Sequence, residues 1–177
     1  MTKAKKVRVV IWSISILLTL GFIFINSCLS KSSSSSESEG LFAKLQPAFD
    51  FIFGEGVVTH GFFRKLAHFG EFGLLGLEIN LLYFELFGQN RKKIYQGLRL
   101  GLYVALIDET IQVFSERGPA IVDVWIDFAG FFTATVLFYM IIGMIGTLKK
   151  AKEKVETQKE IHVTETETEE KEQTEQN

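Results

Sequence analysis

Apolar residues in this chain come in long runs, and most charged residues lie between the runs. The first run covers residues 9–28, which contain no charged side chain and follow four basic residues. The last run covers residues 128–147 and is also uncharged. A helix of about 20 residues rises ~30 Å, which matches the hydrocarbon core of a bilayer. Each of these two runs therefore predicts a transmembrane helix.

Two apolar runs in the middle of the chain, residues 69–87 and 98–114, contain charged side chains. A charged residue at the centre of a transmembrane helix costs about 2.5–3.5 kcal/mol on insertion scales. These runs can cross a membrane only if their polar faces point into a helix bundle. The pattern therefore predicts an all-α membrane protein with four transmembrane helices. After the first helix in residues 1–28, the other three form a core over residues 64–148.

The segment between the first two spans, residues 29–63, predicts a linker and an interfacial helix outside the cell. Residues 31–40 are rich in serine, which is typical of a flexible linker. Apolar residues then recur at helical spacing: Phe42, Leu45, Phe49, Ile52 and Phe53. Pro47 and several glycines interrupt this stretch, which is too short to cross a bilayer. We expect an amphipathic helix that lies in the membrane interface.

Lys and Arg are concentrated near the N-terminus, in the loop at residues 89–96 and at residues 149–154. Because basic residues favour the cytoplasmic side, both termini are predicted to be cytoplasmic. Residues 149–177 contain mostly Glu, Lys, Thr and Gln and no aromatic residue, so we expect a disordered acidic tail, with a fraying helix as the alternative. One alternative remains for the N-terminus, a lipoprotein signal with a lipidated Cys28. The apolar run is longer than the ~7–15 residues of a signal, which favours a retained helix.

The net charge of the chain bears on whether its partner is a nucleic acid. The net charge of the 177 residues is −2, and the isoelectric point is about 6.0. Nucleic-acid-binding proteins usually carry a basic patch and a high isoelectric point, so no nucleic-acid partner is expected. The lipid bilayer is the predicted partner. Cys28 is the single cysteine, so an internal disulfide is excluded.

Polar residues from three separate segments are predicted to meet at the outer end of the bundle. The second and fourth spans begin outside, and the third ends there, so their polar residues share the outer leaflet. The residues of this predicted site are Arg64, Lys65, His68, Glu71, Glu109, Gln112, Arg117, Asp123 and Asp127. Glu109 is expected at the centre, because it lies deep in its span and needs a basic partner from another segment.

Small residues next to these polar positions predict close helix contacts. Gly97 and Gly101 match the GxxxG pattern, and Gly130 follows Asp127 by three residues. Packing within the bundle and association of two copies both remain open for this pattern.

Three motifs carry a resemblance to a known family. Residues 64–72 (RKLAHFGEF), residues 108–114 (DETIQVF) with Arg117, and Asp123 with Asp127 and Gly130 resemble the three motifs of the VanZ-like family. Phe72, Asp127 and Ala134 stand where the family commonly has Tyr, Asn and Gly. The resemblance implies a polytopic protein of the bacterial cell envelope, in a family sometimes linked to low-level resistance to teicoplanin-type glycopeptides. It implies no settled reaction.

Three functions remain open for the polar site. The first is binding of a lipid headgroup, a cell-wall precursor or a glycopeptide. The second is catalysis on a lipid-linked substrate with His68 or Glu109 as acid–base groups. The third is a scaffold in which buried ion pairs hold the helices in register. No nucleophile is evident, so we favour binding over catalysis. Neither a metal nor a cofactor is predicted, since no ligand spacing is diagnostic, although His68, Glu71, Glu109 and Asp123 are chemically suitable ligands.

Overall fold

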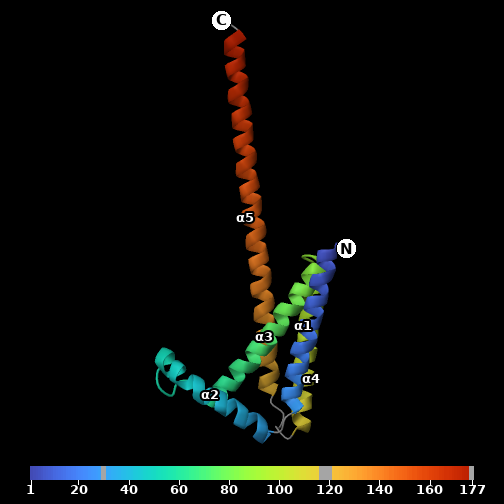
Figure 1. The fold of residues 1–177 in the computed structure, drawn as a ribbon, viewed down its shortest axis with the longest axis vertical. Coiled ribbons are helices and arrows are strands. Elements are labelled where there is room, and N and C mark those ends of the chain that lie inside the picture. The colour runs from blue at the N-terminus through green and yellow to red at the C-terminus, as the bar shows by residue number, and fades with distance from the viewer. Residues whose placement is uncertain (29–30, 116–120, 176–177) are drawn as a thin grey trace. The chain divides into compact units, whose positions relative to one another are not determined.

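The computed structural model of the chain is all-helical over the residues that it describes, which are 1–28, 31–115 and 121–175 (Figure 1). Side chains are described for residues 1–28, 38–115 and 121–158. The helices are α1 (Lys3–Cys28), α2 (Lys31–Phe53), α3 (His60–Phe87), α4 (Arg91–Phe114) and α5 (Ile121–Glu175). This architecture confirms the predicted all-α fold class.

The chain divides into two compact units, Met1–Leu137 and Phe138–Asn177. The first unit contains α1 to α4 and the beginning of α5, and the second contains the remainder of α5. The hydrophobic core and the predicted polar residues with described positions belong to the first unit.

Local capping groups fix where α3 and α4 begin and end. The Thr59 side chain accepts a hydrogen bond from the backbone N–H of Phe62 at 3.3 Å, which caps the start of α3. Gly88 follows α3 with φ +63°, a left-handed conformation that favours glycine. Asn90 then caps α4 by accepting from the N–H of Lys92 at 3.0 Å. This short connection makes α3 and α4 sequential neighbours, and they pack on each other.

The core lies where α1, α3, α4 and the beginning of α5 meet, and α1 contributes the buried Ile23. Phe72 and Leu75 of α3 and Phe131 of α5 are fully buried. A Cβ atom at Gly76 would lie 2.8 Å from the Phe131 carbonyl oxygen, and one at Gly101 would lie 2.6 Å from Cγ of the Phe131 ring. Glycine at these two positions therefore lets Phe131 lie directly against α3 and α4.

Polar contacts between α1 and α3 explain how the charges of the second predicted span are accommodated. Arg8 donates two hydrogen bonds to the Glu85 carboxylate, at 2.6 and 3.1 Å. Deeper in the pair, the buried Glu78 carboxylate accepts from the hydroxyls of Ser15 at 2.6 Å and Thr19 at 3.1 Å. The two contacts run in opposite sequence order, so α1 and α3 are antiparallel.

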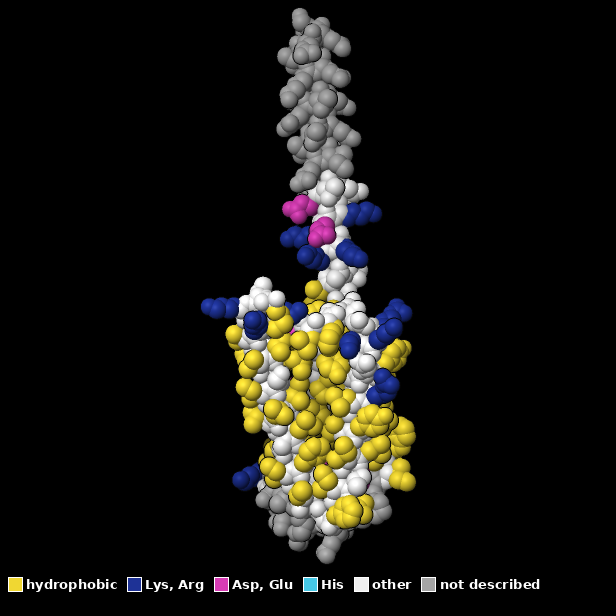
Figure 2. Space-filling view, turned by 90° about the vertical axis from the view of Figure 1, so that its right-hand side faces the viewer, with side chains coloured by type: hydrophobic (Ala, Val, Ile, Leu, Met, Phe, Trp, Pro, Cys, Tyr) yellow, Lys and Arg dark blue, Asp and Glu magenta, His cyan; other side chains and the backbone are white. Residues whose placement is uncertain are grey.

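Two helices are long and apolar enough to cross a membrane by length and composition: α1 and residues Ile121–Gln158 of α5. Side chains such as Leu17, Leu18 and Ile25 of α1 are 65–70% exposed, and Figure 2 shows apolar side chains gathered over the visible face. Lipid would cover such side chains in a membrane. Neither α3 nor α4 reaches the same hydropathy within the described residues, because both contain several charged side chains. The candidate spans are thus two, and the four-span arrangement stays a prediction.

Two polar segments are helical in the structure. The helix α2 begins at Lys31 and contains Pro47, and the flexible linker expected over residues 31–40 stays a prediction. The helix α5 continues to Glu175, and the disorder expected for the tail stays a prediction. Serine costs a helix only about 0.5 kcal/mol relative to alanine, and Glu, Lys and Gln favour helices, so these compositions do not exclude helix.

The helix α2 is attached to α3 by aromatic contacts, in the segment for which an amphipathic interfacial helix was expected. The rings of Phe42 and Phe49 lie 5.5 and 5.9 Å from the ring of Phe63 at the beginning of α3, between centroids.

Candidate functional site

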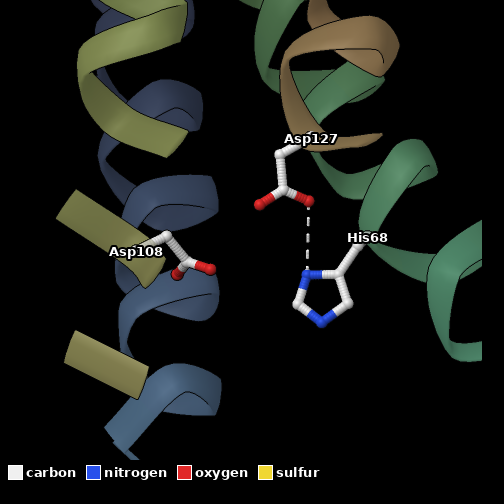
Figure 3. Close-up of side chains that lie close together, drawn as sticks. All are labelled: His68, Asp108 and Asp127. Carbon is white, nitrogen blue, oxygen red and sulfur yellow. Dashed lines mark ion pairs between the residues drawn. The ribbon is translucent and has the colours of Figure 1, made fainter. Parts of the chain in front are cut away.

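Three polar side chains from three helices meet in the first unit. They are His68 of α3, Asp108 of α4 and Asp127 of α5, and Figure 3 shows the two carboxylates and the imidazole ring around a common space. One nitrogen or oxygen atom of each lies within 4.8 Å of the others. Both aspartates are 0% exposed. We refer to these three residues as the His–Asp–Asp cluster.

The Asp127 carboxylate is buried with little compensation. Its Oδ1 lies 3.5 Å from Nδ1 of His68, which is ion-pair distance when the imidazole is protonated (Figure 3). Neither carboxylate oxygen has a hydrogen-bond partner among the described residues, and the same holds for His68 Nδ1. A buried carboxylate without hydrogen bonds is costly, which makes this position a candidate for function.

The Asp108 carboxylate is held on both of its oxygens. The Ser27 hydroxyl of α1 donates to Oδ1, and the Gln112 side-chain amide, one turn along α4, donates to Oδ2 at 2.7 Å. Ser27 also contacts the Ile23 carbonyl at 3.0 Å within α1. Asp108 is therefore fixed in orientation by two neighbours, whereas Asp127 is not.

A pocket of about 170 Å³ opens beside the cluster. It is lined by Gly61, Arg64, Lys65, His68, Asp123 and Ile126. Arg64 is half-buried and Lys65 is exposed, so two cations line a pocket that also includes the imidazole of His68. His68 belongs to both the pocket and the His–Asp–Asp cluster, which joins them into one site.

The structure brings some of the predicted residues together and leaves others apart. Arg64, Lys65, His68 and Asp123 share the pocket, Asp127 contacts His68, and Gln112 contacts Asp108. Glu71 is half-buried on α3. Glu109 is buried at 6% exposure, but the carboxylate in the cluster is that of its neighbour, Asp108. Arg117, another residue of the predicted site, lies outside the described residues.

The glycines predicted to lie at helix contacts differ in how closely they are packed. A Cβ at Gly130 would lie 2.1 Å from the Phe69 carbonyl oxygen of α3, and Gly101 lies against Phe131. At Gly97 the nearest atom would be a ring carbon of Tyr83 at 3.8 Å, which is ordinary contact. The close contacts at Gly101 and Gly130 lie within one copy of the chain.

Sequence reasoning missed Asp108 and Ser27 as site residues. Asp108 lies on the face of α4 that carries the buried residues Gly101, Ala105 and Gln112 at helical spacing, which was the available signal. Ser27 lies four residues after Ile23 on the buried side of α1, but an uncharged hydroxyl in an apolar run gives no comparable signal.

The comparison with known proteins agrees with the motifs. The family model for VanZ/LLP1 matches residues 10–143, which cover most of the first unit and every residue of the polar site. No curated protein and no solved structure gives a match. The match spans more than half of the chain, so the chain belongs to the VanZ/LLP1 family of membrane proteins.

Proposed function

We propose that this membrane protein binds the phosphate-bearing headgroup of an envelope lipid or lipid-linked cell-wall precursor. The supporting observation is the pocket lined by Arg64, Lys65 and His68, which offers two cations and an imidazole in one concave place. Arg can bind a phosphate through two parallel hydrogen bonds, and Lys adds a point charge. The Asp123 carboxylate at the same pocket can accept from a hydroxyl or ammonium group of the headgroup.

The size of the pocket supports a headgroup rather than a whole lipid. A volume of about 170 Å³ accommodates a phosphate and a few attached atoms. The acyl or prenyl chains would then lie along the exposed apolar side chains of the helices. In this proposal the chain crosses the membrane four times with both termini cytoplasmic, and the pocket faces outward. Occupancy of a cell-wall precursor at this site would provide the link to lowered teicoplanin susceptibility.

The test is binding of radiolabelled probes to the purified full chain in nanodiscs. The probes are phosphatidylglycerol, a prenyl-diphosphate-linked precursor and teicoplanin. A basic residue near a membrane surface contributes about 1 kcal/mol to anion binding, so Arg64→Gln with Lys65→Gln should weaken saturable binding about tenfold or more. The matched control is Lys44→Gln, an exposed lysine of α2 outside the pocket. Equal affinities of wild type and the double variant for every probe would refute the proposal.

Catalysis is the second candidate, and the His68–Asp127 contact favours it. A carboxylate beside an imidazole fixes its orientation and stabilises its protonated form, as in acid–base catalysis. The same incubations distinguish the two candidates. Product formation that is lost in His68→Ala would support an enzyme, and saturable binding without product would support the binding function. Neither binding nor product would favour the scaffold.

A further inference from the structure

We propose that His68, Asp108 and Asp127 bind one divalent transition-metal ion. This site goes beyond the proposed headgroup binding and does not depend on it. It also differs from the sequence-based expectation, which included no metal and placed suitable ligands at His68, Glu71, Glu109 and Asp123.

The donor set has the composition of a transition-metal site. One imidazole nitrogen and two carboxylate oxygens are ligands that zinc, iron and manganese accept in proteins. An imidazole is less suited to magnesium or calcium, which prefer oxygen ligands alone. The three ligands come from α3, α4 and α5, so an ion here would also hold three helices together.

The distances fit an ion after small side-chain movements. Two ligands of a tetrahedral zinc ion, each about 2.1 Å from the metal, lie about 3.4 Å apart. Nδ1 of His68 and Oδ1 of Asp127 are 3.5 Å apart, and the three ligand atoms together lie within 4.8 Å. Because Ser27 and Gln112 hold the Asp108 carboxylate, closing the remaining separation requires the side chains of Asp127 and His68 to move toward it.

The burial of Asp127 supplies the second, independent observation. The carboxylate is 0% exposed, and neither oxygen has a hydrogen-bond partner among the described residues. Figure 3 shows this carboxylate directed into the space shared with His68 and Asp108. A divalent cation beside Asp127 would compensate the charge of this buried carboxylate.

The hydrogen bonds to Asp108 are of the kind that orient metal ligands in known sites. Ser27 and Gln112 donate these bonds to its carboxylate. His68 also lines the 170 Å³ pocket, while its Nδ1 and both carboxylate oxygens of Asp127 are buried, so the ion would lie in the interior next to the pocket.

The test is metal content and metal affinity of the purified full chain, produced with an affinity tag that contains no histidine. After dialysis against Zn²⁺, elemental analysis should find about one ion per wild-type chain. Replacement by Co²⁺ should give the visible absorption of a low-coordinate site with nitrogen and oxygen ligands. Asp127→Asn and His68→Gln should each lose the ion and the absorption. Glu78→Gln, which alters another buried carboxylate of α3, should keep both.

Ser27 donates a hydrogen bond to Asp108 and is not itself a metal ligand, so changing it tests the site without removing a ligand. Ser27→Ala should weaken Zn²⁺ affinity about 10–100-fold without abolishing it, as outer-shell changes do. Thermal unfolding should show stabilisation of the wild type by Zn²⁺ and less stabilisation of Ser27→Ala. Wild type that binds no more Zn²⁺ or Co²⁺ than Asp127→Asn, or that shows no Zn²⁺-dependent stabilisation, would overturn the proposal. No lipid probe enters this test, so its result is separate from that for headgroup binding.

Discussion

Gly130→Ala should lower the free energy of unfolding by about 3 kcal/mol, the upper part of the range for an overpacked contact. A Cβ at Gly130 would lie 2.1 Å from the Phe69 carbonyl oxygen and 2.9 Å from the carbonyl carbon. These are backbone atoms of α3, so no side-chain rotation relieves the overlap, and α5 must move. Asp127 lies three residues before Gly130, and His68 precedes Phe69, so the His68–Asp127 contact should be lost as well. Unfolding of detergent-solubilised protein measures the first effect.

Gly70→Ala is the matched control for this change. Gly70 lies in α3 directly after Phe69, and no heavy atom outside its own helix segment lies within 4 Å of a Cβ there. Alanine at an open helical position is neutral or stabilising by up to about 1 kcal/mol. Equal stability of Gly130→Ala and Gly70→Ala would show that α5 does not pack against α3 at this point.

Asp108→Ala should be the most damaging change among the polar residues of α4, with a loss of about 2–3 kcal/mol. Asp108 is 0% exposed and accepts hydrogen bonds from Ser27 and Gln112, so its removal leaves two buried donors without their acceptor. Asp123→Ala should cost far less, because Asp123 is only half-buried at the pocket. Chemical unfolding of metal-free protein measures both, so that loss of a bound ion does not contribute.

A double-mutant cycle isolates the contact across α1 and α4. Ser27→Ala with Asp108→Ala should be less harmful than the sum of the two single changes. Hydrogen bonds between membrane helices show coupling of about 0.6 kcal/mol on average and about 1.7 at most, and a charged acceptor favours the upper value. Strict additivity would mean that the carboxylate does not depend on Ser27.

The sequence was sufficient to predict the all-helical architecture and the family, because both depend on features that persist over many residues. Apolar runs define the helices, and three motifs define the family. The meeting of His68 and Asp127 also followed from the alternation of helix directions, since both lie near the beginnings of their helices.

The sequence did not determine how each helix is rotated about its axis, and so it could not predict which side chains enter the cluster. Adjacent residues differ by about 100° around a helix, yet Asp108 and Glu109 are both buried, and only the packed structure shows that Asp108 enters the cluster. Gly76 was also missed, because its need for glycine comes from Phe131 in another helix. Composition likewise could not decide whether the Ser-rich and Glu-rich segments are helical.

The ligand class proposed for the pocket depends on which side of the membrane the pocket faces. Chemical labelling of Cys28 tests this. Cys28 is the single cysteine, its side chain is exposed, and it follows Ser27, which contacts Asp108 of the cluster. A membrane-impermeant maleimide applied to intact cells should label Cys28 of the wild type and nothing in Cys28→Ser. Gln89→Cys in the Cys28→Ser background tests the turn after α3 and should react only after permeabilisation. Mass spectrometry of the unlabelled protein should show a free thiol at Cys28. Labelling of Cys28 only after permeabilisation, or labelling of the Gln89→Cys variant in intact cells, would contradict an outward-facing site.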